Sequence, residues 1–313
     1  MNSKKILHVD ENHPLLIKGL SDFGYKNILS YHTPLDEIKK ELFKYEGLII
    51  RSRFPIDKEI INTASNLKFI ARVGSGLENI DIDYANSRNI SLIAAPEGNR
   101  NAVGEHAVGL LLSLLNKLRL GHSSIQKGNW LREDHRGFEL EGKTLGIIGY
   151  GNTGKNFAEK LKGFNVKVIY YDIKPNLGNK HAEQVSLNEL QEKAEVLSLH
   201  VPQTRFTTGM INKEFITRMR HPFWFINTSR GKAVITEDLV KGLYSKKILG
   251  AGLDVLEYES SSFQSIFKNK KRPKAFDYLL NAENVILSPH VAGWTAESHV
   301  KLAKIILYKI KTL

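Results

Sequence analysis

The 313-residue sequence contains no cysteine. This absence excludes disulfide bonds, thiolate nucleophiles and cysteine-ligated metal sites, and we expect no metal centre. Long apolar runs are also missing, since the longest, Ala107–Leu115, is half of the roughly 18 residues that a membrane-spanning helix needs. The first ten residues hold only a short apolar stretch, which favours a first strand over a signal peptide. We expect a cytoplasmic protein without a membrane partner.

Acidic residues are fewer than basic ones, 33 against 45, and the formal net charge is +12. An excess of positive charge can indicate nucleic acid or an anionic small molecule as a partner. Here the basic residues are scattered and are not interleaved with aromatic residues. The one dense run, Lys268–Lys274, is interpreted as an exposed loop. We therefore expect solvated lysine-rich surfaces and no nucleic-acid partner.

The length favours two domains, and two series of short apolar runs alternate with segments of helical spacing. This alternation predicts parallel βαβ units and an α/β fold with two doubly wound sheets. The first series occupies residues 1–98, and the second begins at Thr144. Between them, 101–120 is predicted to be one long helix that is apolar nearly all round, and therefore buried between domains or at a subunit interface. An amphipathic helix over 296–310 would return to the first domain, so the second domain is inserted into it.

The segment Gly149–Gly154, GYGNTG, has the spacing G-x-G-x-x-G. A strand precedes it, a helix follows it, and the next strand ends at Asp172, which is the order of a dinucleotide-binding fingerprint. Gly149 would permit the tight turn, Gly151 would let the backbone approach a pyrophosphate, and Gly154 would allow close helix–strand packing. Because a carboxylate at Asp172 binds ribose hydroxyls and repels a 2′-phosphate, we expect NAD as the cofactor.

Ionisable residues follow three later strands. Arg230 ends INTSR, Asp254 and Glu259 lie in GLDVLEYE, and His290 ends ILSPH. Ligands of doubly wound sheets bind at the carboxyl ends of strands. Each residue alone has an ordinary explanation: Arg230 as part of a surface ion pair, Glu259 as a solvated carboxylate and His290 as a loop residue. Together they suit hydride transfer, because arginine binds a carboxylate bidentately, histidine transfers a proton, and glutamate beside histidine favours the imidazolium.

Over nearly its whole length the sequence resembles the D-isomer-specific 2-hydroxyacid dehydrogenases. The resemblance rests on seven segments in matching order: ARVGSGLENID, APEGNRNAVGEHAVGLLL, ELEGKTLGIIGYGNTG, LHVPQT, INTSRG, GLDVLEYE and SPHVAGWT. It implies a Rossmann NAD-binding domain, residues 99–289, inserted into a flavodoxin-like substrate domain, residues 1–98 and 290–313. It also implies an oxidoreductase that works as a homodimer, for which the 101–120 helix is the expected interface.

The resemblance assigns roles to individual residues. Arg230, Glu259 and His290 are implied as the catalytic set. The loop Val73, Gly74, Ser75 and Gly76 is implied to offer backbone N–H groups to the substrate carboxylate. The expected cofactor-binding residues are Gly149, Gly151, Asn152, Thr153, Gly154, Asp172, His200, Pro202, Thr207, Thr228, Ser229, Asp254 and Gly293.

The sequence departs from the family pattern at three places. Ser260 stands where a proline often follows the catalytic glutamate, Thr153 replaces a commoner apolar residue, and the segment 260–280 is an insertion over the cleft or on the surface. The chain ends soon after its last helix, so we expect no serine-binding regulatory domain.

The substrate is expected to be a small D-2-hydroxy acid or its 2-keto acid. Arg51 and Arg53, at a strand end of the first domain, would suit the phosphate of D-3-phosphoglycerate or 3-phosphohydroxypyruvate, and hence serine biosynthesis. Lactate, glyoxylate and hydroxypyruvate are the alternatives. Formate or phosphite oxidation remains open, as does a different class, a non-catalytic protein that senses NAD(H).

Overall fold

The computed structural model describes residues 4–259 and 272–313. They divide into two compact units: 4–99 with 294–313, and 100–259 with 272–293. The breaks expected from the sequence lie near these, after residue 98 and before residue 290. Of the 260–280 insertion, residues 260–271 lie outside the described part of the chain.

The first unit is built on a parallel five-stranded sheet in the order β2-β1-β3-β4-β5. This is the flavodoxin-like order of a doubly wound sheet. Every strand predicted in this half of the chain is present, and the predicted α/β fold is confirmed. The strands are β1 (Lys5–His8), β2 (Lys26–Leu29), β3 (Gly47–Ile50), β4 (Phe69–Arg72) and β5 (Ser91–Ile93).

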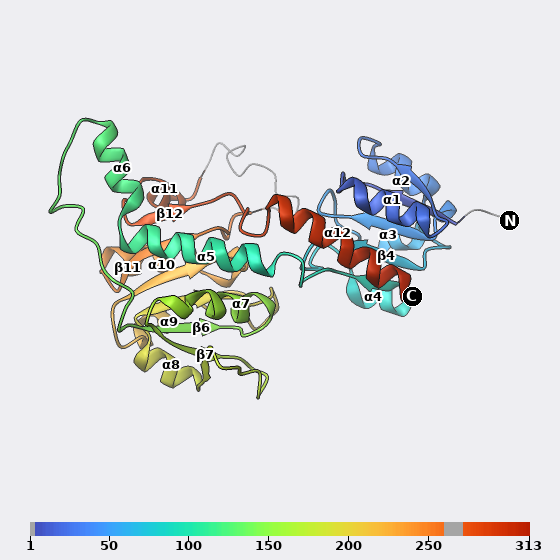
Figure 1. Ribbon diagram of the computed structural model, residues 1–313. Coiled ribbons are helices and arrows are strands. Elements are labelled where there is room, and N and C mark those ends of the chain that lie inside the picture. Colours follow the sequence, from blue (N-terminus) through green and yellow to red (C-terminus); the bar gives the residue numbers. More distant parts are fainter. Residues whose placement is uncertain (1–3, 260–271) are drawn as a thin grey trace. The chain divides into compact units, whose positions relative to one another are not determined.

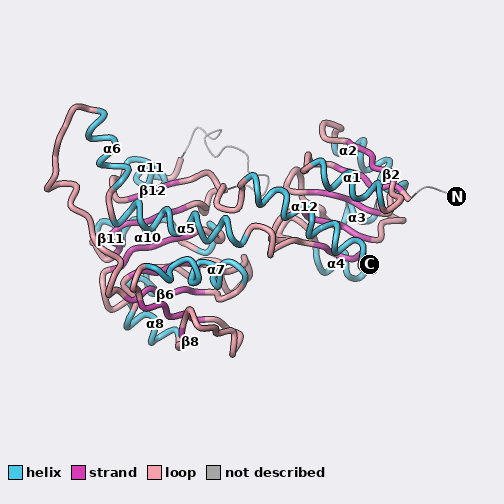
Figure 2. Tube along the Cα trace, viewed as in Figure 1, coloured by secondary structure: helices cyan, strands magenta, loops and turns pink. Residues whose placement is uncertain are grey.

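Helices cover both faces of this sheet (Figure 2). One face carries α1 (Pro14–Asp22) and the carboxyl-terminal α12 (Ala296–Lys311), which pack side by side over one apolar core (Figure 1). At their contact, a Cβ on Gly19 would lie 2.5 Å from Leu307. The amphipathic helix predicted at the end of the chain therefore does complete the first unit. The other face carries α2 (Leu35–Glu41), α3 (Lys58–Thr63) and α4 (Ile82–Ser87).

The second unit contains a seven-stranded parallel sheet in the order β12-β11-β10-β9-β6-β7-β8. Counted from β6, this is the Rossmann order 3-2-1-4-5-6 with one further strand. The order reverses between β6 and β9, and in such sheets ligands bind beyond the strand ends at that point. The strands are β6 (Thr144–Ile148), β7 (Lys167–Tyr171), β8 (Glu183–Gln184), β9 (Val196–Leu199), β10 (Phe223–Asn227), β11 (Ile248–Leu253) and β12 (Val285–Leu287).

Two helical layers cover this sheet as well. On one face, α5 (Arg100–Leu115) and α7 (Asn152–Lys160) pack against each other and enclose one apolar cluster. The opposite face carries α8 (Leu187–Lys193), α9 (Lys213–Arg218), α10 (Thr236–Tyr244) and α11 (Lys274–Asn281). Both faces of the sheet are thus buried, which explains strands such as FWFIN that are apolar without alternation.

The helix predicted over 101–120 is two helices. It ends at Leu115, and α6 (Leu118–Gln126) starts after Lys117, whose backbone is left-handed at φ +50°. The apolar surface of α5 is covered by other parts of the same chain, because its buried residues face α7, β10 and β11. The segment that leaves the body is instead α6 and the loop after it (Figure 1).

The described residues contain neither a candidate membrane span nor a candidate metal site. No helix in residues 4–259 and 272–313 combines the length and apolar character needed to cross a membrane. In the same ranges no three histidine or acidic side chains are grouped closely enough to hold a metal ion.

Candidate active site and dinucleotide site

The three glycines of the β6–α7 turn are required for three different reasons. Gly149 has φ +91°, and a Cβ there would lie 2.4 Å from the carbonyl oxygen of His200. A Cβ on Gly154 would lie 2.2 Å from the carbonyl oxygen of Gly149, so this glycine allows α7 to pack close to β6. A Cβ on Gly151 would meet nothing within 4 Å. No protein contact therefore requires glycine at 151, which suits a position reserved for a ligand.

Asp172 follows β7 directly and lies beside this turn. Its Oδ2 accepts a hydrogen bond from the backbone N–H of Tyr150 at 2.7 Å, and its Oδ1 accepts one from Lys174 at 2.9 Å. These bonds hold the carboxylate at the carboxyl edge of the sheet. Each oxygen keeps a further lone pair, so the group can still accept bonds from ribose hydroxyls.

His200 lies beneath the glycine turn and not on its surface. Its ring nitrogens are 2.9 Å from Ser198 Oγ and 3.1 Å from Thr153 Oγ1, and Phe157 packs on its face. Burial lowers the pKa of His200 to about 3, so the ring is neutral at neutral pH. That His200 lines the adenosine or pyrophosphate side of the cofactor stays a prediction; in the structure its ring supports the glycine turn through Thr153.

The loop after β9 is held by one hydroxyl. Thr207 Oγ1 donates to the carbonyl oxygen of Pro202 at 2.6 Å and accepts from the N–H of Thr204 at 2.8 Å. The side chain of Thr207 therefore shapes the loop in which Pro202 lies. Asn152 opens α7, at the helix end where backbone N–H groups lack intrahelical partners.

The turn that carries Arg230 is built by Asn227, a fully buried residue that the sequence analysis did not single out. Its Oδ1 accepts from the N–H and the hydroxyl of Ser229, and its Nδ2 donates to the carbonyl oxygen of Arg230. In the same turn, Thr228 Oγ1 is buried without a hydrogen-bond partner among the described residues. An orphaned buried hydroxyl is rare, and a bound ligand would satisfy it.

Gly231 brings a second loop against this turn. A Cβ at this position would lie 2.0 Å from the carbonyl oxygen of Leu256. Only glycine allows such an approach, and the approach places the 254–259 loop next to Arg230. Gly231 is the last residue of the segment INTSRG, which the sequence analysis noted, but the sequence does not reveal which backbone segment this glycine contacts.

Glu259 and His290 lie side by side, as the sequence predicted. Glu259 Oε2 lies 2.7 Å from His290 Nδ1, and Glu259 Oε1 accepts from the N–H of Leu256 at 2.5 Å. His290 itself has a left-handed backbone with φ +56°. Such strain in a non-glycine residue persists only where surrounding contacts impose it, and it clusters at functional sites.

Asp254 imposes part of that strain. The residue is 1% exposed, and its carboxylate accepts from Ser288 Oγ at 2.6 Å and from the N–H groups of Val291 and Ala292 at 2.9 and 2.8 Å. Its carbonyl oxygen also accepts from the N–H of His290 at 2.8 Å. The expected contact of Asp254 with the nicotinamide end of the cofactor stays a prediction, and the structure shows that the carboxylate binds the turn that carries His290, just before Gly293.

The two arginines of the first unit that were predicted to bind substrate differ in the contacts of their guanidinium groups. The guanidinium of Arg53 donates to the carbonyl oxygens of Val9, Ser30 and Thr33, which hold it in place, and its contact with substrate stays a prediction. The guanidinium of Arg51 stacks 4.0 Å from the ring centroid of Trp294 and makes no hydrogen bond or ion pair within the described residues. Burial lowers the pKa of Arg51.

The loop after β4 was predicted to bind a carboxylate through its N–H groups. Those of Val73 and Gly74 are taken by the carbonyl oxygens of Ile50 and Arg72. Those of Ser75 and Gly76 have no hydrogen-bond partner within the described residues, and the Ser75 hydroxyl donates to Asn99 Oδ1 at 2.6 Å. The second half of the loop is thus the part suited to an anion.

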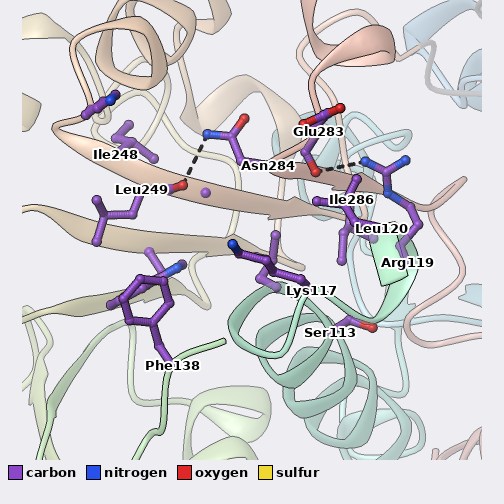
Figure 3. A pocket seen from close by; sticks show the side chains of 14 residues that line it. Ser113, Lys117, Arg119, Leu120, Phe138, Ile248, Leu249, Glu283, Asn284 and Ile286 are labelled. Carbon is purple, nitrogen blue, oxygen red and sulfur yellow. Dashed lines mark hydrogen bonds between the residues drawn. The ribbon is translucent and has the colours of Figure 1, made fainter. Parts of the chain in front are cut away.

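A cavity of about 270 Å³ lies at the other end of the second sheet (Figure 3). It borders the amino-terminal ends of β10, β11 and β12, whereas Arg230, Asp254 and His290 follow their carboxyl ends. Leu114, Leu120, Phe138 and Trp224 supply an apolar lining, and Arg119 donates to the carbonyl oxygen of Glu283. The cavity is therefore at the opposite end of the sheet from the residues that could carry out a reaction.

Comparison with known proteins matches residues 108–292 to the family described as D-isomer specific 2-hydroxyacid dehydrogenase, NAD binding domain. The chain is 34% identical over 276 residues to a D-3-phosphoglycerate dehydrogenase from Archaeoglobus fulgidus, covering 87% of this chain and 50% of that one. It is 34% identical over 283 residues to a hydroxypyruvate reductase from Thermotoga maritima, covering 90% and 89%.

A similar solved structure is the D-lactate dehydrogenase from Aquifex aeolicus complexed with NAD and lactic acid. It has a TM-score of 0.83 and 28% identity, and the match covers 99% of this chain and 95% of that one. The chain spans about half the length of the phosphoglycerate dehydrogenases that it matches.

The glycine turn generates a paired prediction. Gly151→Ala is expected to leave the melting temperature within about 1 °C, because its Cβ meets only open space, but to weaken NADH binding at least about tenfold by obstructing a phosphate. Gly154→Ala is expected to lower the melting temperature by several degrees, because its Cβ collides with backbone. Thermal unfolding and NADH fluorescence titration measure both; equal NADH affinity in Gly151→Ala and wild type would contradict the assignment.

Proposed function

This chain belongs to the D-isomer-specific 2-hydroxyacid dehydrogenase family, and on that basis we propose that it interconverts a small D-2-hydroxy acid and its 2-keto acid with NAD. The observation that carries the proposal is the 2.7 Å contact of Glu259 with His290, on loops that Asp254 and Gly231 hold beside the Arg230 turn. A protein that only senses NAD(H) has no need of this ion pair or of the strained backbone at His290.

The residues present fit a dinucleotide. Four features keep capacity that residues 4–259 and 272–313 do not use: the open side of Gly151, the amino terminus of α7, the remaining lone pairs of Asp172 and the hydroxyl of Thr228. NAD, when bound, would supply the two-electron acceptor for the hydrogen on C2 of the substrate. A carboxylate at Asp172 supports NAD over NADP, since it repels a 2′-phosphate.

We assign the acid–base step to His290. With Nδ1 bonded to Glu259, Nε2 is the ring nitrogen that would take the hydroxyl proton during oxidation and return it during reduction. Glu259 stabilises the imidazolium formed in this step and keeps the ring from rotating. Arg230, held by its own bond to the carbonyl oxygen of Ser229, would bind the substrate carboxylate and the C2 oxygen through its planar fork.

Arg230→Lys tests this assignment. The substitution keeps the charge and loses the fork, so we expect a loss of at least about a hundredfold in kcat/KM, with NADH affinity unchanged. Arg220→Lys, at an exposed ion pair with Glu192, is the matched control and should be indistinguishable from wild type. Near-normal turnover of Arg230→Lys would refute the role, and NADH binding without turnover of any 2-keto acid by the wild type would favour a sensor.

For the substrate we propose the pair D-3-phosphoglycerate and 3-phosphohydroxypyruvate, which would place the reaction in serine biosynthesis. The support is Arg51, a partly buried cation whose donors are not used by the described residues. A second candidate, glyoxylate or hydroxypyruvate reduction, is favoured by the bonds of the Arg53 guanidinium to carbonyl oxygens and by the negative charges of Asp10 and Glu11 near Arg51.

A panel of 2-keto acids separates the two candidates. If the substrate is phosphorylated, Arg51→Gln should raise KM for 3-phosphohydroxypyruvate by at least about tenfold, since a charge-assisted bond to phosphate is lost, and should leave KM for glyoxylate within about twofold. NADH oxidation is the measurement for wild type and variant. Equal effects on both substrates, or faster turnover of glyoxylate by the wild type, would support the second candidate.

We also propose a homodimer, and place its contact on α6 and the loop after it. This segment carries five exposed apolar side chains, Leu118, Ile125, Trp130, Leu131 and Phe138, and α6 buries none of its residues. The apolar cavity of Figure 3 begins at its base. Projecting apolar side chains next to an apolar cavity make one surface self-complementary, as a two-fold interface requires.

Sedimentation velocity at micromolar concentration checks this. The wild type is expected to sediment as a dimer of 35.4 kDa chains. Trp130→Asp should shift the equilibrium to monomer, because it puts a charge into the contact. Tyr308→Asp replaces a similarly exposed aromatic residue on α12 and should remain dimeric. A monomeric wild type would rule the dimer out.

A further inference from the structure

His106, on α5, belongs to a hydrogen-bonded group that the proposed reaction does not use. Its Nε2 lies 2.9 Å from Ser288 Oγ and 3.6 Å from Asp254 Oδ1, while Ser288 Oγ lies 2.6 Å from the same carboxylate oxygen. His106 and Ser288 are 182 positions apart in the sequence. The three side chains therefore connect α5 to the loops that follow β11 and β12.

The direction of each hydrogen bond in this group is determined. An ionised carboxylate can only accept, so the single hydroxyl proton of Ser288 must point to Asp254. Ser288 Oγ is then the acceptor for His106, and His106 Nε2 must carry a proton. A histidine with its proton on Nδ1 alone would place two lone pairs against each other at 2.9 Å.

The group ends at the backbone of His290. Asp254 holds the N–H groups of Val291 and Ala292 through its carboxylate and that of His290 through its carbonyl oxygen. These bonds surround the residue with φ +56°. Any loss of order in Asp254 would let this turn relax and would move the imidazole away from Glu259.

We propose that His106 is a positioning residue, whose Nε2–H, acting through Ser288, orients Asp254 and so holds His290 in its working geometry. The inference rests on the function proposed above for His290. It assigns His106 no contact with substrate or cofactor. Its effect should appear in kcat, because a displaced His290 impairs the proton transfer and leaves the binding groups in place.

Two substitutions of His106 distinguish the effect of its N–H donor from the effect of the packing of its ring. His106→Leu removes the donor and should lower kcat between about tenfold and a hundredfold, with KM for the 2-keto acid and for NADH within about threefold. His106→Gln supplies an amide N–H at a similar reach and should restore kcat to within about threefold of wild type. His221→Leu, at an exposed histidine before β10, is the matched control and should be unchanged.

The path through Ser288 is tested by a double-mutant cycle. Ser288→Ala should lower kcat about as much as His106→Leu, and the double variant should lose little more than either single one, because the two residues act in series. Multiplying effects would overturn the proposal. So would a loss in His106→Leu that falls on KM and kcat alike and is not recovered by His106→Gln, since that pattern indicates packing alone.

A measurement on the unmodified protein does not depend on turnover. Nitrogen-15 NMR of the histidine side chains, with His106 identified by its absence from the His106→Gln spectrum, should show a protonated Nε2. An unprotonated Nε2 would overturn the proposal. A protonated Nε2 in a chain that turns over no 2-keto acid would leave the hydrogen-bonded group intact and would count against the proposed function instead.

Discussion

A carboxylate taken out of water must find donors for its lone pairs, and this requirement at Asp254 organises much of the second unit. The side chain is 1% exposed and lies at the end of β11, where it binds Ser288, Val291 and Ala292. The loop after β12 must therefore fold back onto β11, and His290 is carried with it. The ion pair with Glu259 follows from this constraint, as does the left-handed backbone that the histidine adopts. Removing one partner of such a buried charge is costly, because the carboxylate is left with a lone pair that has no donor.

Parallel strands bring their carboxyl ends to one edge of a sheet, and the other residues of the candidate site lie at this edge for that reason. The glycine turn follows β6, Asp172 follows β7, and Asn227 builds the Arg230 turn after β10. Residues that are 18 to 81 positions apart in the chain thus come to one edge of the sheet through strand order. The close approaches at Gly154 and Gly231 then bring the backbone segments to their final spacing, since any side chain there would meet a carbonyl oxygen.

The pattern of strands, the two sheets and the pairing of Glu259 with His290 could be predicted because they depend on local apolar runs, glycine spacing and position after a strand. The hydrogen-bond partners of polar side chains could not be predicted where more than one partner was possible. Arg53 and Arg51 look equivalent in IIRSRF, yet one binds three carbonyl oxygens and the other stacks on Trp294. His200 and Asp254 are polar residues at strand ends whose partners come from distant segments. The break at Lys117 was missed because a lysine with positive φ has no sequence signature, unlike glycine.

The backbone of His290 has a further consequence for how this chain can change. Glycine and asparagine tolerate a left-handed conformation better than histidine does, so either one at position 290 would relieve strain that histidine maintains. Such a substitution would favour the fold while removing the imidazole to which the proposed reaction assigns the proton transfer. On backbone conformation alone, histidine is not the residue that this position favours.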